Sequence, residues 1–219
     1  VYTKSYDGIW MHLYTANNAE IEWRGKKINI DVDTNYPWEG KIEITVNGEG
    51  NFSFYLRVPG WCDRWSVKVN GSEIETKKDR GYVKIERLWS KGDKIELNLE
   101  MEAEYVESHP NIKDNVGRLA IKRGPIVYCL EQVDNSFDIE DLEVILSEKL
   151  STEYSHILGG VVVIKGKGKV ISKDVWKNKL YIPKRILEEK RREVEFKAIP
   201  YYAWANREPG PMLVWVKKY

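Results

Sequence analysis

Apolar and polar side chains alternate with a period of two through much of the first half of the chain. This alternation is typical of strands that turn one face to a core and the other to water. It therefore predicts half-buried antiparallel strands rather than helices. The clearest stretches, named by their apolar positions, run from Ile42 to Val46, from Phe52 to Val58 and from Ile95 to Met101.

Short turn sequences separate these stretches at intervals of about ten residues, a spacing typical of β-sandwiches. They are rich in Gly, Asn and Asp because these residues tolerate the positive φ that tight hairpins need. The turns are Asp7-Gly8, Asn47-Gly48, Asn70-Gly71, Arg80-Gly81 and Lys91-Gly92-Asp93. The first half of the chain thus predicts a sandwich of short strands.

The second half carries further strand signals with a less regular pattern. Residues 117–131 predict two strands around an Arg-Gly-Pro break, and residues 159–172 predict a hairpin with a glycine-rich turn. We expect the last strands at residues 194–198 and 212–217. Helix is scarce, and the best candidate, Pro183 to Glu195, supports only a short charged surface helix or loop.

The fold class that follows is all-β, with two antiparallel, jelly-roll-like β-sandwich domains in tandem and little helix. The polar segment from Glu107 to Asn115 separates two strand-rich halves. We therefore predict a first domain at residues 1–106 and a second at residues 107–219. An alternative left open by the sequence is that the last strands of the second domain return to pack on the first domain.

Charge and hydropathy argue against two kinds of partner. The chain has 35 Lys and Arg against 34 Asp and Glu, so little excess charge is available to hold nucleic acid through its phosphates. No apolar run reaches the roughly 18 residues of a membrane span, and the first residues lack the features of a secretion signal. We expect no nucleic-acid partner, no membrane partner and a cytoplasmic location. The start at Val1, inside strand-like sequence, suggests a fragment or a processed product.

No catalytic or metal-binding pattern stands out in the chain. His12, His109 and His156 do not cluster by sequence, and Cys62 and Cys129 lie far apart without ligands at metal-binding spacing. We expect both cysteines to be free thiols. The nucleophile motif GxSxG is absent, and the 34 acidic residues single out no carboxylate pair of the kind a glycosidase uses.

Aromatic residues with a polar tip are frequent, with nine Trp and thirteen Tyr against four Phe. Such side chains favour half-wet surfaces, including sugar platforms and domain interfaces. Several lie in loops beside Pro or Gly, and the segment Tyr201 to Arg207 (YYAWANR) packs three rings together. Three interpretations stay open for these rings: plugs at the end of a sandwich core, an interface with another domain, and a carbohydrate platform.

Six longer motifs follow one another along the chain: TNYPWEGKIEITV, FYLRVPGWC, VNG, GYVKIERLWSKGDKIELNLEM, HPNIKDNVGRLAIKRGPIVYCLE and IPYYAWANREPGPMLVWV. In this order they resemble the C-terminal part of glycoside hydrolase family 127, the β-L-arabinofuranosidase-like proteins. The resemblance runs over nearly the whole chain and is weakest from about Asp134 to Lys197.

The resemblance implies an N-terminal (α/α)6 barrel that performs the chemistry, followed by two β-sandwich domains. In that family the nucleophile is a zinc-bound cysteine thiolate and the acid/base is a glutamate, both in the barrel. This chain lacks the paired cysteines of that site and the motif before them, so no catalytic or metal residue is carried over. We expect no cofactor in this chain and zinc in the missing catalytic domain.

The predicted function is that of the non-catalytic β-sandwich portion of a family 127-like retaining glycosidase, whose parent acts on β-L-arabinofuranosides or related plant sugars. We interpret the aromatic loops as contacts with the missing barrel or with a second copy of the chain. The predicted contact residues are Trp38, Trp61, Tyr201, Tyr202 and Trp204, with Arg57 and Arg207 as hydrogen-bonding partners beside them. Two rival hypotheses stay open: a free-standing carbohydrate-binding module, and a complete small enzyme with an unfamiliar carboxylate pair.

Overall fold

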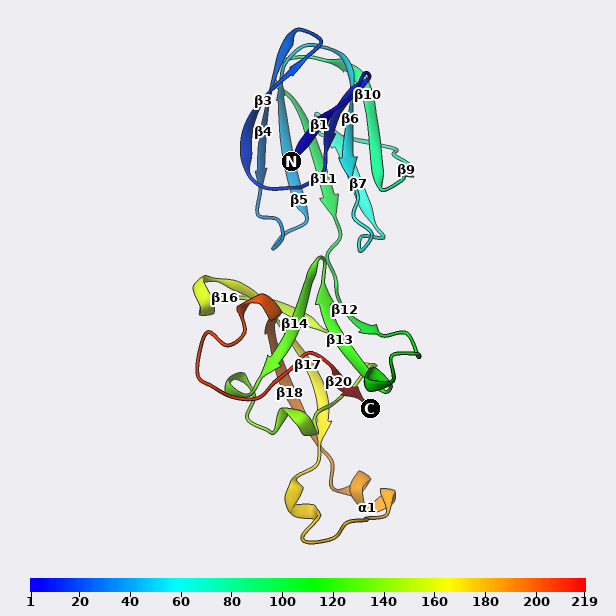
Figure 1. Cartoon of the computed structure of the whole chain (residues 1–219), viewed down its shortest axis with the longest axis vertical. Helices are drawn as coiled ribbons and strands as arrows, with labels where there is room; N and C mark the ends of the chain where they lie inside the picture. The colour runs from blue at the N-terminus through cyan, green and yellow to red at the C-terminus, as the bar shows by residue number, and fades with distance from the viewer. The chain divides into compact units, whose positions relative to one another are not determined.

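The computed structural model describes residues 1–219, and the chain divides into two compact units, Val1–Met101 and Glu102–Tyr219 (Figure 1). This boundary lies slightly before the one predicted at 106/107. The reason is that β12 (Ala103–Glu107) pairs along its whole length with β13 (Arg118–Arg123) and so belongs to the second unit. The polar segment that suggested a linker follows β12 within that unit.

The first unit is a sandwich of two sheets. Its strands are β1 (Tyr2–Lys4), β2 (Gly8–Met11), β3 (Asn17–Trp23), β4 (Lys26–Thr34), β5 (Lys41–Asn47), β6 (Gly50–Arg57), β7 (Trp65–Val69), β8 (Ser72–Ile74), β9 (Lys78–Asp79), β10 (Tyr82–Trp89) and β11 (Asp93–Leu99). One sheet has the order β1-β2-β6-β10-β9 and the other the order β3-β4-β5-β11-β7-β8. Neighbouring strands are antiparallel except β2 and β6, which run parallel. The predicted sandwich is thus found in this unit, with one parallel pair added.

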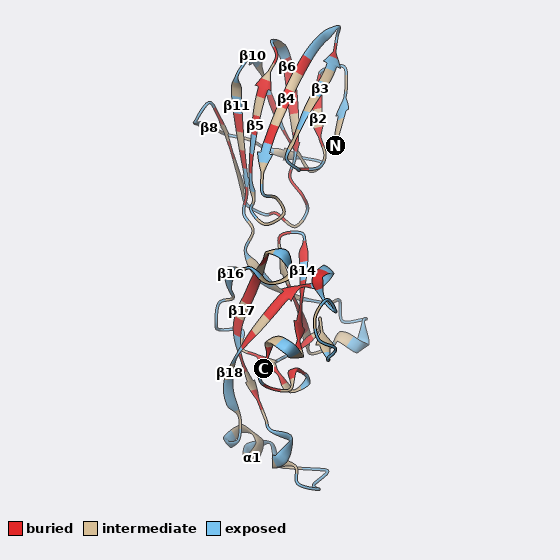
Figure 2. Cartoon of the chain, turned by 90° about the vertical axis from the view of Figure 1, so that its left-hand side faces the viewer, coloured by how far each residue is buried: buried red, intermediate tan, exposed pale blue.

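Side-chain alternation decides which residues form the core of this sandwich. In β5, Ile42, Ile44 and Val46 are buried, while Lys41 and Glu43 face outward. The same alternation buries one face of β6, β10 and β11, so that each sheet gives an apolar layer to a shared interior (Figure 2). The strands predicted from periodicity in the first half are therefore confirmed.

The second unit contains nine strands in one sheet. Besides β12 and β13 these are β14 (Ile126–Glu131), β15 (Glu143–Val144), β16 (Ser151–Ser155), β17 (Val161–Val170), β18 (Arg192–Pro200), β19 (Met212–Leu213) and β20 (Val216–Lys218). Because β13 pairs with both β14 and β20, the sequence of neighbours β13-β14-β18-β17-β15-β20 closes into a ring. The all-β tandem organisation is confirmed, but this unit is a small closed barrel rather than two stacked sheets.

Strand β17 corrects the hairpin predicted at residues 159–172. It runs without a turn through the glycine-rich stretch and pairs with β18 from Ile164 to Val170. A Cβ added to Gly166 would lie 2.5 Å from the ring carbon Cζ of Phe196, and one added to Gly168 would lie 2.5 Å from Cδ1 of Leu142. Glycine is therefore required here by close packing inside a strand.

The only α-helix is α1 (Lys184–Glu189), in the segment that joins β17 to β18 (Figure 1). It is shorter than the predicted 183–195 because the chain enters β18 at Arg192. The last strands, β19 and β20, pair with β14, β13 and β15, so they stay in the second unit. No helix of the structure has the length and apolar character needed to cross a membrane.

Candidate functional site

Two of the predicted contact residues lie in neighbouring loops of the first unit. The Trp61 ring packs against the core and lies 6.5 Å from the Tyr36 ring, at an angle of 20° between the ring planes. Trp38, also half-buried, follows in the loop of Tyr36, and its backbone N–H donates to the carbonyl of Asn35 at 2.8 Å. Trp61 thus combines a side packed on the core with a side left at the surface, and Trp38 is partly exposed.

Arg57 lies at the end of β6 with its side chain exposed. Its guanidinium donates to the backbone carbonyl of His12 at 3.3 Å. Its own backbone carbonyl accepts a hydrogen bond of 2.6 Å from the Tyr14 hydroxyl. Burial raises the pKa of Tyr14 well above its ordinary value, so this hydroxyl stays protonated and continues to donate. Arg57 is therefore held at its backbone by Tyr14 and at its guanidinium by the carbonyl of His12.

The other predicted rings lie in the loop after β18. The rings of Tyr201 and Trp204 are nearly parallel, at 13°, with centroids 6.2 Å apart. Tyr201, Tyr202 and Trp204 are exposed by 43%, 62% and 41%. This segment therefore presents its rings at the surface of the second unit and does not plug the core.

A buried ionic cluster fixes the loop that carries these rings. The Arg207 guanidinium pairs with the carboxylates of Glu131 and Asp134, whose side chains are only 8% and 5% exposed. Lys197 also pairs with Asp134, at 2.5 Å. The backbone N–H of Ala205 donates to Glu131 Oε1 at 2.8 Å. Arg207 thus makes its hydrogen bonds to Asp134 and Glu131 inside the unit, where they hold the loop in place.

Opposite charges also set the protonation states in this cluster. Burial alone would raise the pKa of Asp134, but the hydrogen bonds from Arg207 and Lys197 outweigh it and lower the pKa of that carboxyl. The hydrogen bonds to Asp134 and Glu131 raise the pKa of Arg207 further above its already high value. Asp134 and Arg207 are therefore both charged at neutral pH, and the loop is held by charge-assisted hydrogen bonds.

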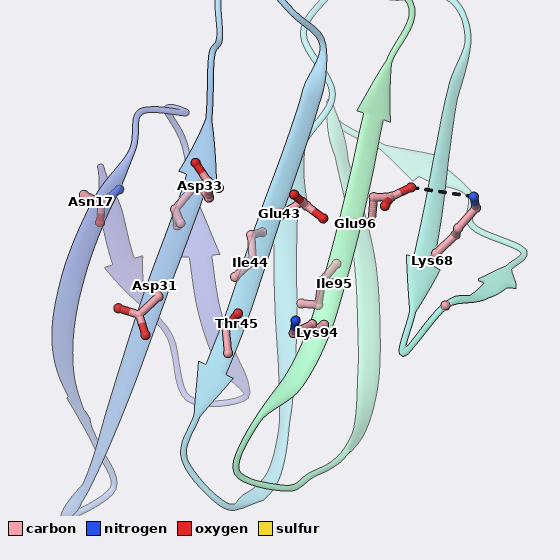
Figure 3. A pocket seen from close by; sticks show the side chains of 12 residues that line it. Asn17, Asp31, Asp33, Glu43, Ile44, Thr45, Lys68, Lys94, Ile95 and Glu96 are labelled. Atoms are coloured by element: carbon pink, nitrogen blue, oxygen red, sulfur yellow. Dashed lines mark ion pairs between the residues drawn. The ribbon is translucent and has the colours of Figure 1, made fainter.

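The outer face of the six-stranded sheet in the first unit is polar and hollowed. Figure 3 shows this hollow, of about 370 Å³, across β4, β5 and β11. Its polar lining consists of Asn17, Asp31, Asp33, Glu43, Thr45, Lys68, Lys94 and Glu96. Glu96 pairs with Lys68 at 3.6 Å, marked by the dashed line in Figure 3. No aromatic ring lines this hollow, so it is not a stacking platform for sugars.

The outer face of the five-stranded sheet is aromatic, which the sequence reasoning missed. Trp10 of β2 and Tyr55 of β6 stack with centroids 3.8 Å apart and ring planes 3° apart. Tyr82 of β10 meets Trp10 edge-on at 4.9 Å, and its hydroxyl lies 2.7 Å from Nδ1 of His12. All three rings occupy outward positions of strands whose inward positions are buried. The signal in the period-two pattern was the presence of rings at outward positions, because outward positions of a solvated sheet are ordinarily polar.

The structure offers no obvious centre for metal or thiol chemistry. Within residues 1–219 no group of three or more His, Cys, Asp or Glu side chains is arranged to hold a metal ion. Cys62 and Cys129 are free and buried. Burial raises the pKa of both thiols, that of Cys129 to about 12. Protonated, enclosed thiols are poor nucleophiles and poor ligands.

Two family models match the chain, one on each unit. Residues 8–101 match the model described as "Beta-L-arabinofuranosidase, GH127 middle domain". Residues 103–217 match the model described as "Glycoside hydrolase family 127 C-terminal domain". The gap between the two matches coincides with the structural division at Met101 and Glu102.

Known proteins of this kind are similar over the full chain but are much longer. A non-reducing end β-L-arabinofuranosidase of Bifidobacterium longum is 29% identical over 100% of this chain and 34% of its own length. The crystal structure of a GH127 β-L-arabinofuranosidase from Geobacillus stearothermophilus T6 superimposes with a TM-score of 0.94 at 38% identity, covering 100% of this chain and 35% of that one. A third structure, of a GH127 β-arabinofuranosidase, superimposes with a TM-score of 0.87 at 31% identity, covering 100% of this chain and 36% of that one. The chain thus spans about a third of the relatives it matches.

Two compact β units, joined directly and matched in order by these models, define the paired β-domains of a glycoside hydrolase. The chain belongs to glycoside hydrolase family 127.

Proposed function

We propose that this chain is the β-domain region of a larger β-L-arabinofuranosidase-like enzyme and that the reacting groups lie in another part of that enzyme. The observation that carries the proposal is the match of the whole chain to about a third of each relative, in a middle and a C-terminal domain. The enclosed thiols and the lack of a metal-holding group within residues 1–219 are compatible with it.

The proposed reaction of the complete enzyme is the retaining hydrolysis of β-L-arabinofuranosides or related plant sugars. Its catalytic cysteine, glutamate and zinc would lie in an (α/α)6 barrel outside these residues. The names of the relatives support the sugar class, since two of them are described as β-L-arabinofuranosidases. We also propose a cytoplasmic location, which two free cysteines support because paired cysteines are the rule in oxidising compartments.

The role proposed for this chain is to support the catalytic domain through its exposed rings. Tyr201, Tyr202 and Trp204 are held by the cluster of Arg207 and Glu131 before any partner binds. A pre-ordered aromatic surface loses little conformational entropy on contact, which favours it as an interface. Without the catalytic domain, the same surface is proposed to promote self-association.

The first test is an activity assay on the isolated chain. With nitrophenyl β-L-arabinofuranoside as substrate, we expect no turnover with or without added zinc. Turnover by the purified chain, with no turnover in a mock preparation that lacks the chain, would contradict the proposal. It would favour a complete small enzyme.

The second test addresses the contact surface in the full-length enzyme. Tyr202→Ser combined with Trp204→Ser is expected to lower the thermal stability of the catalytic domain, measured by loss of activity on heating. Tyr154→Ser is the matched control, because Tyr154 is exposed to a similar extent, 60% against 62% for Tyr202. Equal inactivation temperatures for the double variant, the control and the unmodified enzyme would rule out the proposed contact.

A further inference from the structure

Exposed apolar side chains of the first unit gather on one of its two sheets. Within this unit, the large apolar residues that are more than half exposed are Tyr6, Leu13 and Leu88. Tyr6 lies in the turn between β1 and β2, Leu13 lies just after β2, and Leu88 lies on β10. All three thus belong to the five-stranded sheet or its connections, and no residue of the six-stranded sheet is in this group. The two outer faces of the sandwich therefore differ in character, one being polar and the other partly apolar.

Half-buried rings form the centre of the partly apolar side. We call the surface formed by Trp10, Tyr55 and Tyr82 the aromatic face. Its polar tips are bonded within the unit, since the Trp10 indole N–H donates to the Ser5 hydroxyl at 2.9 Å and the Tyr55 hydroxyl donates to Asp7. The rings are thus ordered before any partner binds, so contact with a partner costs them little conformational entropy.

The stacking of the rings shows what kind of partner suits the aromatic face. Trp10 and Lys84 are the cross-strand neighbours of Tyr55 on its two sides. Trp10 covers one face of the Tyr55 ring, and Nζ of Lys84 lies 5.8 Å from the centroid of that ring. Mutual stacking removes one face of each ring from contact with a ligand. A sugar that stacks on a ring needs an open face, whereas a protein surface also packs on ring edges.

Arg57 adds an exposed positive charge beside these rings. It is the cross-strand neighbour of Tyr82, and its guanidinium donates only to the backbone carbonyl of His12. It forms no ion pair within residues 1–219, whereas Lys84 on the same face pairs with Glu86 at 2.7 Å. A carboxylate on a partner would therefore find an unpaired guanidinium here. Trp, Tyr and Arg are also the residues that carry most of the binding energy at protein interfaces.

Enzymes of this family contain a further domain that is able to cover this face. Residues 8–101 match a model described as a middle domain, so another domain precedes it in the complete enzyme. The chain covers 34% and 35% of two relatives, so about two thirds of each lies outside it. Directly before the matched residues, β1 (Tyr2–Lys4) pairs with β2 at the edge of the five-stranded sheet. The preceding domain is therefore joined to this unit at the sheet that carries the aromatic face.

We propose that the aromatic face is the docking surface for the domain that precedes it in the complete enzyme. The matching surface of that domain presents apolar side chains to the rings and a carboxylate to Arg57. That this domain is the catalytic one rests on the proposed function. The contact is separate from the one proposed for Tyr201 and Trp204, because those rings belong to the second unit.

Hydroxyl-radical footprinting with mass spectrometry tests the contact, because it measures how fast accessible side chains are oxidised. The complete enzyme is compared with this chain alone. We expect Trp10, Leu13 and Tyr82 to be oxidised about fivefold more slowly in the complete enzyme, since a packed interface excludes water. Tyr181, exposed in the second unit, is expected to react equally in both. Tyr128, buried in the core, should react slowly in both and so reports that the fold is intact.

A charge reversal tests the role of Arg57. Arg57→Glu in the complete enzyme is expected to return the oxidation rate of Tyr82 toward its value in the isolated chain, because two carboxylates would then face each other. Lys94→Glu is the matched control, since Lys94 is also an exposed cation without an ion pair and lies on the outer face of the opposite sheet. Unchanged thermal unfolding of the isolated chain with either substitution excludes loss of the fold as the cause.

Three results would overturn the proposal. Equal oxidation of the aromatic face in the enzyme and in the chain, or slowing that Tyr181 shares, would show that the preceding domain does not cover it specifically. Protection in the isolated chain that grows with its concentration would assign the face to a second copy. Protection of the isolated chain by added L-arabinose would assign it to a sugar. The readout is oxidation, so a complete enzyme that fails to cleave arabinofuranosides leaves this test intact.

Discussion

Arg207 and Asp134 stand 73 residues apart in the sequence and are joined by two hydrogen bonds, one of them 3.0 Å long. The pair connects the ring-bearing loop to the segment that follows β14. Neither charge is well hydrated, since the side chains of Arg207 and Asp134 are only 20% and 5% exposed. Removing one partner of this pair is therefore expected to cost more than removing one partner of an ion pair on the sheet surfaces.

Replacing Arg207 by Ala is expected to destabilise the second unit by about 3 kcal/mol. The reason is that Glu131 and Asp134 would remain buried with one partner fewer, and only Lys197 would compensate for Asp134. Urea unfolding followed by circular dichroism measures the change. Arg64→Ala serves as control, because the Arg64–Glu100 pair has exposed fractions of 64% and 44%. The control is expected to change the free energy of unfolding by less than about 1 kcal/mol. Similar losses in both variants would contradict this account.

The stability of the second unit is expected to fall in acid because of Asp134. The pKa of this carboxyl is lower in the folded protein than its ordinary value of about 4. Its contribution is therefore complete above pH 4 or so, and it is lost as the pH falls through the lower folded pKa, where the unfolded chain binds the proton more readily. Asp134→Asn should be less stable at pH 7 and should show a flatter dependence between neutral and acidic pH. A parallel displacement of the two curves would exclude Asp134 as the source.

Gly166→Ala is expected to cost about 1–3 kcal/mol, the range for forcing a methyl group into a filled core. The new Cβ would meet the Phe196 ring at 2.5 Å and the Leu150 side chain at 2.8 Å. Thermal unfolding measures the effect, and Lys167→Ala, on the exposed side of the same strand, is the neighbouring control. If the alanine variant unfolds at the temperature of the parent, the glycine has no packing role.

The two thiols are expected to resist alkylation in the folded protein. Cys62 and Cys129 are 0% exposed, and burial raises the pKa of both. Iodoacetamide at pH 8 should leave both unmodified, whereas both should react in denaturant, and intact mass spectrometry counts the added groups. Rapid labelling of Cys129 in the native state would show that the second unit opens far more readily than its packing indicates.

The regular strands of the first unit could be predicted from the sequence because each has one solvent-exposed face and one buried face. The pattern of Ile42, Ile44 and Val46 needs no knowledge of distant residues. The continuous strand β17 was not predicted, since glycine in a sequence indicates a turn unless its neighbours in space are known. Gly166 faces Phe196 of β18, and only the folded chain shows that contact.

The sites were harder to foresee than the strands. The loop of Tyr201 was found from its composition, but the role of Arg207 depends on acids more than seventy residues away in sequence. The aromatic face formed by Trp10, Tyr55 and Tyr82 was legible in principle, as rings at outward positions.

The ring of strands in the second unit affects how that unit can come apart. A strand at an open edge peels away after one ladder of backbone bonds breaks, but a strand within a closed ring must break two. Six strands share this protection, whereas β12, β16 and β19 lie outside the ring. Amide hydrogen exchange should therefore be slowest, and uniformly so, around the ring, with β16 exchanging early by fraying.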